Sequence, residues 1–486
     1  MVVKNVSTLN HNLKRRAILV LFCLIIVQLS TPVVALTTID IQNIETDHGA
    51  VILITDGLGA NYINPEKIPY ALDGNPLEKP DVKNISAFAK DGLQAFSVLI
   101  PSTKGENGHS VIVTGNPGAT TAMIAYNDAT IYDIARDNGY IMFAILEKGD
   151  TAELIDKQDI TIHDSTTSIN DPQMKVVLNN FPDQPDNDMI LDVEQIFKEY
   201  AILAPTYIQQ YKEGEIERYN AYNLWGIETS LKVIEMMEQY PDQKYILTTN
   251  IGAIDAAGIY RRNEGYVECI EALDIMVQPL IERTEDNDLA FILTSDHGMA
   301  FQSTDGRGGS KSGKYATSPE VLQIPFIATS SNIERKFIRE QIGQEDIAPT
   351  ILSILDLPNE LRFSAGDSFA SKRYVNFKIL LPENGSVSIS SKEIVLKAED
   401  DSEYIFYGLE PDKEYSITAE LSGNDEQVYE RTVFADSDKI IRFNEDKETG
   451  EKENMIPKGT RRTIGSIFII IINMAGLVMI FRVIKS

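Results

Sequence analysis

Short, wholly apolar runs recur along the first three quarters of the chain, and each ends in polar residues. The run 289–293 leads into Asp296 and His297, and the run 51–54 leads into Asp56 and Gly57. Uninterrupted apolar runs of this length are typical of strands buried on both faces, as in a parallel sheet covered by helices. Similar runs predict further strands over 110–113, 140–146, 245–249 and 324–328.

Segments with apolar residues at helical spacing lie between these runs. They predict helices over 130–138, 221–239, 266–278 and 345–355, and Gly139 and Pro241 mark two of their ends. Strands that alternate with helices indicate an α/β domain with a mainly parallel sheet, which we expect to span 45–370. The polar, aspartate-rich region of about 160–220 is expected to be an insertion or cap over the sheet, or a packing subdomain.

The pattern changes after Pro358. Over 372–445, short apolar runs separated by Pro, Gly, Asn and Asp predict a small all-β sandwich module. A charged linker at 446–462 follows, and the apolar run 464–481 has the length of a C-terminal transmembrane helix. A buried core helix is the alternative for this run.

The amino terminus carries an export signal. Lys14, Arg15 and Arg16 precede the apolar run 17–27, so residues 1–36 are expected to be a signal peptide or an uncleaved N-terminal anchor. Basic residues flank both sides of 464–481, so the positive-inside rule alone does not orient that segment. Export of the amino terminus predicts a protein of the cell membrane whose main body is extracytoplasmic.

Charge and cysteine content exclude some functions. The chain has 44 Lys and Arg against 72 Asp and Glu, a net charge of -28, which argues against nucleic acid as a partner. Of the two cysteines, Cys23 lies in the leader and Cys269 in the body, so we expect neither a disulfide within the mature chain nor a cysteine-based metal site. Nothing in the sequence indicates an oligomeric state.

Asp56, Asp296 and His297 are candidate metal ligands. Each follows a predicted strand, and the carboxyl ends of strands in open α/β sheets meet at the crevice where ligands bind. Two carboxylates and an imidazole suit Zn²⁺, Mn²⁺ or Mg²⁺. The alternatives are plain turns: Asp56 before Gly57, and a Ser-Asp turn followed by a chance histidine.

Several short motifs occur in the order found in a known superfamily. They are 54–57, His109 followed by 113–115, 294–298, 323–327, and 346–350 leading to 355–358. In these motifs the chain resembles the alkaline phosphatase superfamily, which includes nucleotide phosphodiesterases, sulfatases, phosphopentomutases and cofactor-independent phosphoglycerate mutases. The resemblance covers about 50–358 and implies a phosphoryl- or sulfuryl-transfer site at the carboxyl edge of the sheet.

The resemblance also assigns the metal ligands. Asp56, Asp296 and His297 match the ligands of one metal, and Asp255 matches the first ligand of a second. The family pattern there is Asp-x-x-Gly-His, but this chain has Ile259 in place of the histidine. A further family histidine is also missing, so we expect a divergent member with an incomplete second site and one divalent metal, with Zn preferred over Mn or Mg.

The catalytic residues follow the family less closely. Lys314 resembles the lysine of a Gly-Lys pair that holds the anionic substrate in sulfatases, although it could be a solvated loop residue. The family nucleophile, four residues before His109, is replaced by Gly105. A longer loop would bring Thr103 into place as the nucleophile.

The substrate contacts expected from the resemblance are Ser102, Lys104 and His109, with Ser102 also the next-best nucleophile. The predicted function is a membrane-anchored, extracytoplasmic, metal-dependent hydrolase or transferase that acts on small-molecule or surface phosphoric esters. The alternative is a catalytically degenerate binding or scaffold protein, and a sulfatase is a minor alternative.

Overall fold

The computed structural model describes residues 36–443 apart from 148–151, 167, 180, 182–186, 393–394 and 423–427. The leader before residue 36, the linker 446–462 and the apolar run 464–481 lie outside the described residues. Among the described helices, none is long and apolar enough to cross a membrane.

A mixed sheet of ten strands forms the centre of the α/β domain. Its middle strands β5, β4, β7, β2 and β8 run parallel, whereas β11 and β6 pair antiparallel with β8 and β5. All residues of β2, β7 and β8 are buried, which the apolar runs of β2 and β8 predict, and β7 also buries Thr248, Thr249 and Asn250. The order is β12 (Lys336–Ile338), β3 (Leu93–Leu99), β11 (Gln323–Thr329), β8 (Leu289–Thr294), β2 (Gly49–Thr55), β7 (Tyr245–Ile251), β4 (Ile141–Leu146), β5 (Ile160–Asp164) and β6 (Met174–Leu178), with β13 (Ile342–Gly343) beside β3.

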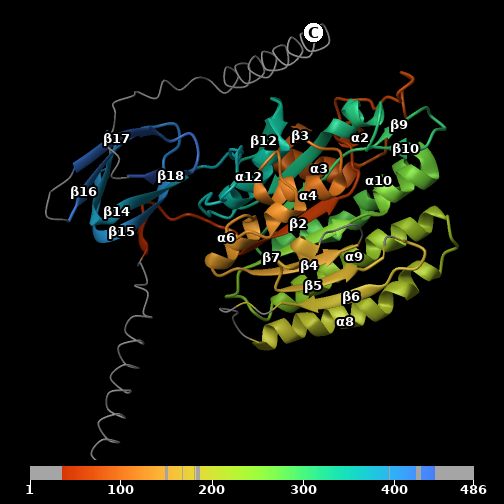
Figure 1. Ribbon diagram of the computed structural model, residues 1–486, viewed down its shortest axis with the longest axis horizontal. Helices are drawn as coiled ribbons and strands as arrows, with labels where there is room; N and C mark the ends of the chain where they lie inside the picture. The colour runs from red at the N-terminus through yellow and green to blue at the C-terminus, as the bar shows by residue number, and fades with distance from the viewer. Residues whose placement is uncertain are drawn as a thin grey trace, which may run out of the picture. The chain divides into compact units, whose positions relative to one another are not determined.

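Helices cover both faces of this sheet (Figure 1). Alternate residues of β2 face opposite cores: Val51 and Leu53 contribute to one, and Ala50, Ile52 and Ile54 to the other. The first core includes residues of α3 (Lys83–Asp91), α8 (Asn187–Gln209), α9 (Ile216–Met237) and α10 (Ala253–Asp286), and the second includes α4 (Gly105–Thr114), α6 (Ile131–Asp137) and α12 (Ile347–Ile354). Shorter helices are α2 (Ala60–Ile63), α5 (Thr121–Ile124), α7 (Ala152–Ile155), α11 (Pro319–Leu322), η1 (Tyr315–Thr317) and η2 (Gln344–Asp346), and a small hairpin joins β9 (Ala300–Phe301) to β10 (Gly308–Gly309).

Two predictions of local structure were wrong. The run 110–113 belongs to α4, not to a strand; four apolar residues are too few to distinguish a buried strand from a buried helix turn. For 160–220 the structure contradicts the alternative of a cap over the sheet, because β5 and β6 extend the sheet itself and α8 packs alongside them; the alternative of a packing subdomain stays a prediction. Many polar residues of this region lie in loops and on the helices α8 and α9, and β5 and β6 are only five residues long, so the sequence did not indicate the two strands.

The strands after residue 372 form a separate sheet, here called the β module. It contains β14 (Val375–Ser390), β15 (Val395–Leu409), β16 (Glu414–Leu421), β17 (Val428–Phe434) and β18 (Lys439–Arg442). The N-terminal strand β1 (Leu36–Asp40) joins this sheet by pairing parallel with β15, which the sequence did not indicate. Register shifts interrupt the long β14–β15 pair, and the sheet encloses its own core, which includes Phe377, Tyr404 and Tyr415.

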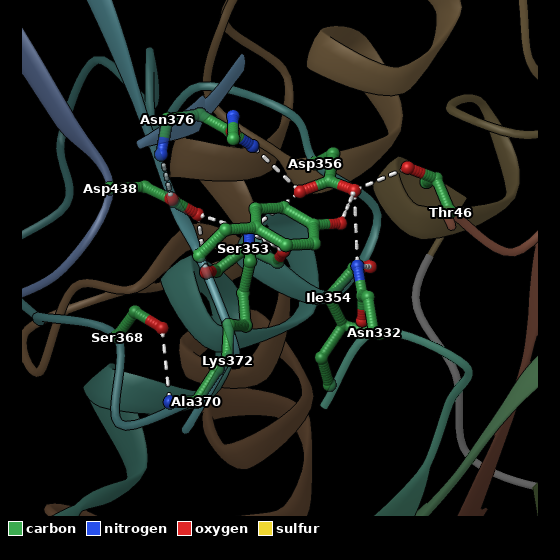
Figure 2. Close-up of polar contacts among 12 residues, drawn as sticks. Thr46, Asn332, Ser353, Ile354, Asp356, Ser368, Ala370, Lys372, Asn376 and Asp438 are labelled. Atoms are coloured by element: carbon green, nitrogen blue, oxygen red, sulfur yellow. Dashed lines mark hydrogen bonds and ion pairs between the residues drawn. The ribbon is translucent and has the colours of Figure 1, made fainter. Parts of the chain in front are cut away.

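A buried ion-pair network joins the β module to the α/β domain (Figure 2). The Lys372 ammonium lies 2.6 Å from Asp356, which follows α12, and 2.8 Å from Asp438, which precedes β18. It also donates to the Ser353 carbonyl at 3.0 Å. The Asp356 carboxylate accepts further hydrogen bonds from Thr46, Asn332, Tyr374 and Asn376.

Candidate metal centre

Three predicted ligands meet at the carboxyl edge of the sheet. Asp56 follows β2, His297 follows β8, and Asp255 lies in the first turn of α10, which follows β7. These three strands are neighbours in the sheet, and one potential ligand atom from each residue lies within 4.8 Å of the other two. His297 Nε2 is 3.5 Å from Asp56 Oδ1. Two carboxylates and one imidazole at these separations fit a divalent metal ion.

Asp296, the fourth predicted ligand, is fully buried beside this cluster. Its Oδ1 atom accepts hydrogen bonds from the backbone N–H groups of Gly57, at 3.1 Å, and His297, at 2.7 Å. Its Oδ2 atom is buried without a hydrogen-bond partner among the described residues and lies 3.6 Å from His297 Nε2. A buried carboxylate oxygen left in this state is costly unless a cation is close, so the geometry suits a metal ligand.

The pKa of Asp296 is lowered despite its burial. Burial alone would raise this pKa, but the imidazoles of His297 and His109 and the N–H donors of Gly57 and His297 outweigh that effect. The carboxylate is therefore held in its charged form, which is the form that binds metal.

Buried polar side chains fix the positions of the loops that carry the ligands. The Tyr266 hydroxyl donates to the Gly57 carbonyl at 2.8 Å and accepts from the Gly59 N–H at 3.0 Å. Gln344 donates through Nε2 to the Asp296 carbonyl at 3.0 Å. Neither role could be recognised from the sequence: Tyr266 falls within a predicted helix, and Gln344 is marked only by its position just before the family-like stretch 346–350.

The α4 helix places His109 against Asp296. His109 is buried, and its Nε2 atom lies 3.8 Å from Asp296 Oδ2. The backbone of α4 also lies close to Asp296: a Cβ atom built at Gly108 would lie 2.6 Å from the Asp296 carbonyl oxygen. His109, predicted to contact substrate, therefore lies beside a metal ligand.

The predicted nucleophile Thr103 lies just before α4 and is half-buried. Ser102 Oγ accepts from the Lys104 N–H at 3.3 Å and from Asn107 Nδ2 at 3.4 Å, and Lys104 is the exposed N-cap residue. Their catalytic and binding roles remain predictions.

Lys314 is exposed, and the cavity that it lines includes none of the four ligands. It lines a cavity of about 460 Å³ with Leu72, Asp73, Gln302, Ser312, Gly313 and Tyr315. Ile259, which replaces the expected second-metal histidine, packs against an apolar core. The structure therefore groups Asp56, Asp255, Asp296, His297 and His109, and leaves Lys314 outside that group.

A family comparison agrees with this centre. The model of the "Metalloenzyme superfamily" matches residues 222–359, a range that contains Asp255, Asp296 and His297. Over these residues the chain is similar to the Metalloenzyme superfamily, as the alkaline-phosphatase-like motifs predicted. The predicted family resemblance is thus confirmed, and similarity to a metalloenzyme superfamily supports a divalent metal without identifying it.

Individual relatives match only part of this chain. A 2,3-bisphosphoglycerate-independent phosphoglycerate mutase of Mycoplasma pneumoniae is 31% identical over 107 residues, which are 22% of this chain and 20% of the mutase. The chain thus matches about a fifth of that relative. Among solved structures, a mutant of the alkaline phosphatase PafA has a TM-score of 0.48 and 11% identity, covering 68% of this chain and 99% of PafA. The lipoteichoic acid synthase LtaP from Listeria monocytogenes has a TM-score of 0.44 and 11% identity, covering 81% of this chain and 86% of LtaP.

Proposed function

We propose that the protein is a metal-dependent hydrolase or transferase that acts on phosphoric esters. The observation that carries the proposal is the cluster of Asp56, Asp255 and His297, whose ligand atoms lie within 4.8 Å of one another, with Asp296 Oδ2 beside it. The matched mutase is a phosphoglycerate mutase by name, so it acts within the same class of substrate.

Asp56, Asp255, Asp296 and His297 would hold one divalent cation. When bound, such an ion lowers the pKa of a coordinated hydroxyl and neutralises charge on a phosphoryl group. The chain itself supplies the charged, hydrogen-bonded form of Asp296 and the rigid loops that fix its direction. Because Asp255, Asp296 and His297 are buried and the Asp56 side chain is only 13% exposed, water competes little for the ligand positions.

Thr103 is the hydroxyl that we propose attacks the ester. Its oxygen would form a new bond to phosphorus while the bond to the ester oxygen breaks, and the hydroxyl proton would leave with the released alcohol. Hydrolysis of the phosphothreonine by water, or transfer to a second alcohol, would then complete the reaction. His109 would stabilise the Asp296 carboxylate, and Lys104 at the N-cap of α4 would face the anionic substrate.

We further propose that the protein is held in the cell membrane by the segment 464–481, with its main body outside the cytoplasm. Support comes from the sequence: an export signal within 1–36 and an apolar run of membrane-spanning length near the carboxyl end. A protease-protection experiment on intact cells tests this orientation. Cleavage of the body by external protease is the expected result, and full protection would contradict it.

The test of the activity is hydrolysis of p-nitrophenyl phosphate and bis-p-nitrophenyl phosphate by the purified full chain. We expect metal-dependent turnover that is lost in D56A, which removes a ligand, and in T103A, which keeps the ligands. T120A removes an exposed threonine elsewhere and should remain active. A folded, metal-free wild-type protein that hydrolyses neither ester would refute the proposal.

A catalytically degenerate binding protein is the second candidate. Gly105 stands where the family carries its nucleophile, and Ile259 stands where it carries a second-metal histidine. This candidate predicts that the wild-type protein binds metal and phosphate but turns over neither ester, and that T103A changes neither binding constant.

A further inference from the structure

Glu147 is a fully buried carboxyl group that lies next to the metal centre but is not one of the predicted ligands. It follows β4, the strand adjacent to β7, and is 0% exposed. Its Oε2 atom accepts a hydrogen bond from the Gly252 N–H at 2.9 Å. Its Oε1 atom has no hydrogen-bond partner among the described residues.

The neighbouring helix α9 leaves room for this carboxyl group. Gly226 lies inside that helix, and a Cβ atom built there would lie 2.7 Å from Glu147 Oε1. A glycine within a helix costs roughly 1 kcal/mol relative to alanine. The chain carries this cost at the position where a larger residue would displace Glu147.

The Glu147 hydrogen bond acts on the first turn of α10. Gly252 is the N-cap residue of that helix, and the next N–H group, that of Ala253, donates to Asn223 Oδ1 at 3.2 Å. Two side chains from other elements thus hold the start of α10. Asp255 lies in the same turn, and its own N–H donates to the Asp56 carbonyl at 3.1 Å.

We propose that Glu147 is a positioning residue for the metal ligand Asp255. The inference rests on the proposed metal-dependent function. Glu147 fixes the Gly252 peptide, and with it the first helical turn, so that the Asp255 carboxylate stays within reach of Asp56 and His297. Without this contact, the turn can shift by a fraction of an ångström, which is enough to weaken a metal site.

The test measures Mn²⁺ binding to the full-length apoprotein, by electron paramagnetic resonance of free Mn²⁺ in a titration. E147A is expected to raise the Kd about 10- to 100-fold, the effect typical of removing a group that orients a metal ligand. E147Q keeps an acceptor for the Gly252 N–H and should bind close to wild type. G226A keeps Glu147 but crowds it, so it too should weaken binding.

Asp274 provides a matched control. It is a buried carboxylate that accepts the N–H groups of Asn84 and Ile85 and so caps α3. It belongs to the part of α10 beyond the kink at Arg262. D274A should lower the thermal midpoint without changing the Mn²⁺ Kd, which separates a general loss of stability from a loss of positioning.

Each outcome decides between the two proposals. Wild-type protein that binds neither Mn²⁺ nor, in an equilibrium dialysis of the same apoprotein, Zn²⁺ overturns the proposed function and this inference together; if only Zn²⁺ binds, the variants are compared by their Zn²⁺ Kd. Binding by wild type with an unchanged Kd in both G226A and a folded E147A overturns the positioning role alone. If E147A does not fold, G226A and E147Q still decide: weak binding by G226A with normal binding by E147Q supports the role, and wild-type affinity in G226A rejects it.

Discussion

The Lys372→Met substitution should separate the stability of the β module from that of the α/β domain. Lys372 is 3% exposed in its side chain and pairs with Asp356 and Asp438, one on each side of the junction. Breaking a buried ion pair by removing one partner costs about 3–5 kcal/mol. Methionine preserves most of the apolar stem, so the loss is mainly electrostatic.

We expect the lower end of this range, about 3 kcal/mol, because both carboxylates keep other donors. Asp356 retains Thr46, Asn332, Tyr374 and Asn376, and Asp438 retains the Ser353 hydroxyl at 2.6 Å and the Asn376 N–H at 2.7 Å. The double variant K372M/D438N also removes the charge of one of the two buried carboxylates that lose their lysine partner, so it should recover part of the lost stability.

The single tryptophan makes the assay selective. Trp225 is fully buried in α9, so its fluorescence reports unfolding of the α/β domain, whereas far-ultraviolet circular dichroism reports both parts. In urea, the two transitions should coincide for wild type and separate for K372M. K157M removes a buried lysine that pairs with Asp133 within the α/β domain, and its transitions should still coincide. A loss below about 1 kcal/mol with coincident transitions for K372M would refute the reasoning.

Three further predictions concern the metal centre. D296N should lose Mn²⁺ binding but stay folded, because an asparagine Oδ1 still accepts the Gly57 and His297 N–H groups; retained binding in a titration would contradict this. Burial raises the pKa of Glu147 above its ordinary 4.5. The stability associated with the neutral carboxyl group is therefore fully present below pH 4.5 and is lost as the pH rises toward the pKa of Glu147 in the folded protein. Glutamine does not ionise, so the free energy of unfolding of E147Q relative to wild type should increase from pH 4 to pH 8 in urea titrations. If the difference in the free energy of unfolding between E147Q and wild type is the same at pH 4 and pH 8, the pKa of Glu147 is not raised. G108A should weaken Mn²⁺ binding, since its Cβ would press on the Asp296 carbonyl, whereas G118A, in an open turn, should not.

The buried strands and three of the ligands could be predicted from the sequence for one physical reason. A strand buried on both faces must be apolar throughout, so β2 and β8 are visible as runs, and the polar residue that ends each run marks the sheet edge. Asp56, Asp296 and His297 follow such runs directly. Asp255 does not, since Gly252, Ala253 and Ile254 separate it from the end of β7, and its assignment came from the family pattern.

Features that depend on long-range contacts were not predictable. The pairing of β1 with β15 joins residues that lie more than 360 positions apart, and no local pattern indicates it. Glu147 and Gln344 look like ordinary loop residues, because their importance lies in the backbone groups they contact. The edge strand β6 is short and partly exposed, and Lys175 interrupts its apolar residues, so it lacks the longer apolar run by which the central strands are recognised.

The central claim is that Asp56, Asp255, Asp296 and His297 bind a single divalent metal ion. Metal content of the purified full chain, measured by inductively coupled plasma mass spectrometry beside an H297A variant, tests it most directly. The expected result is about one divalent ion per wild-type chain and none above background in folded H297A. A metal-free wild-type protein, or equal metal content in both proteins, would contradict it.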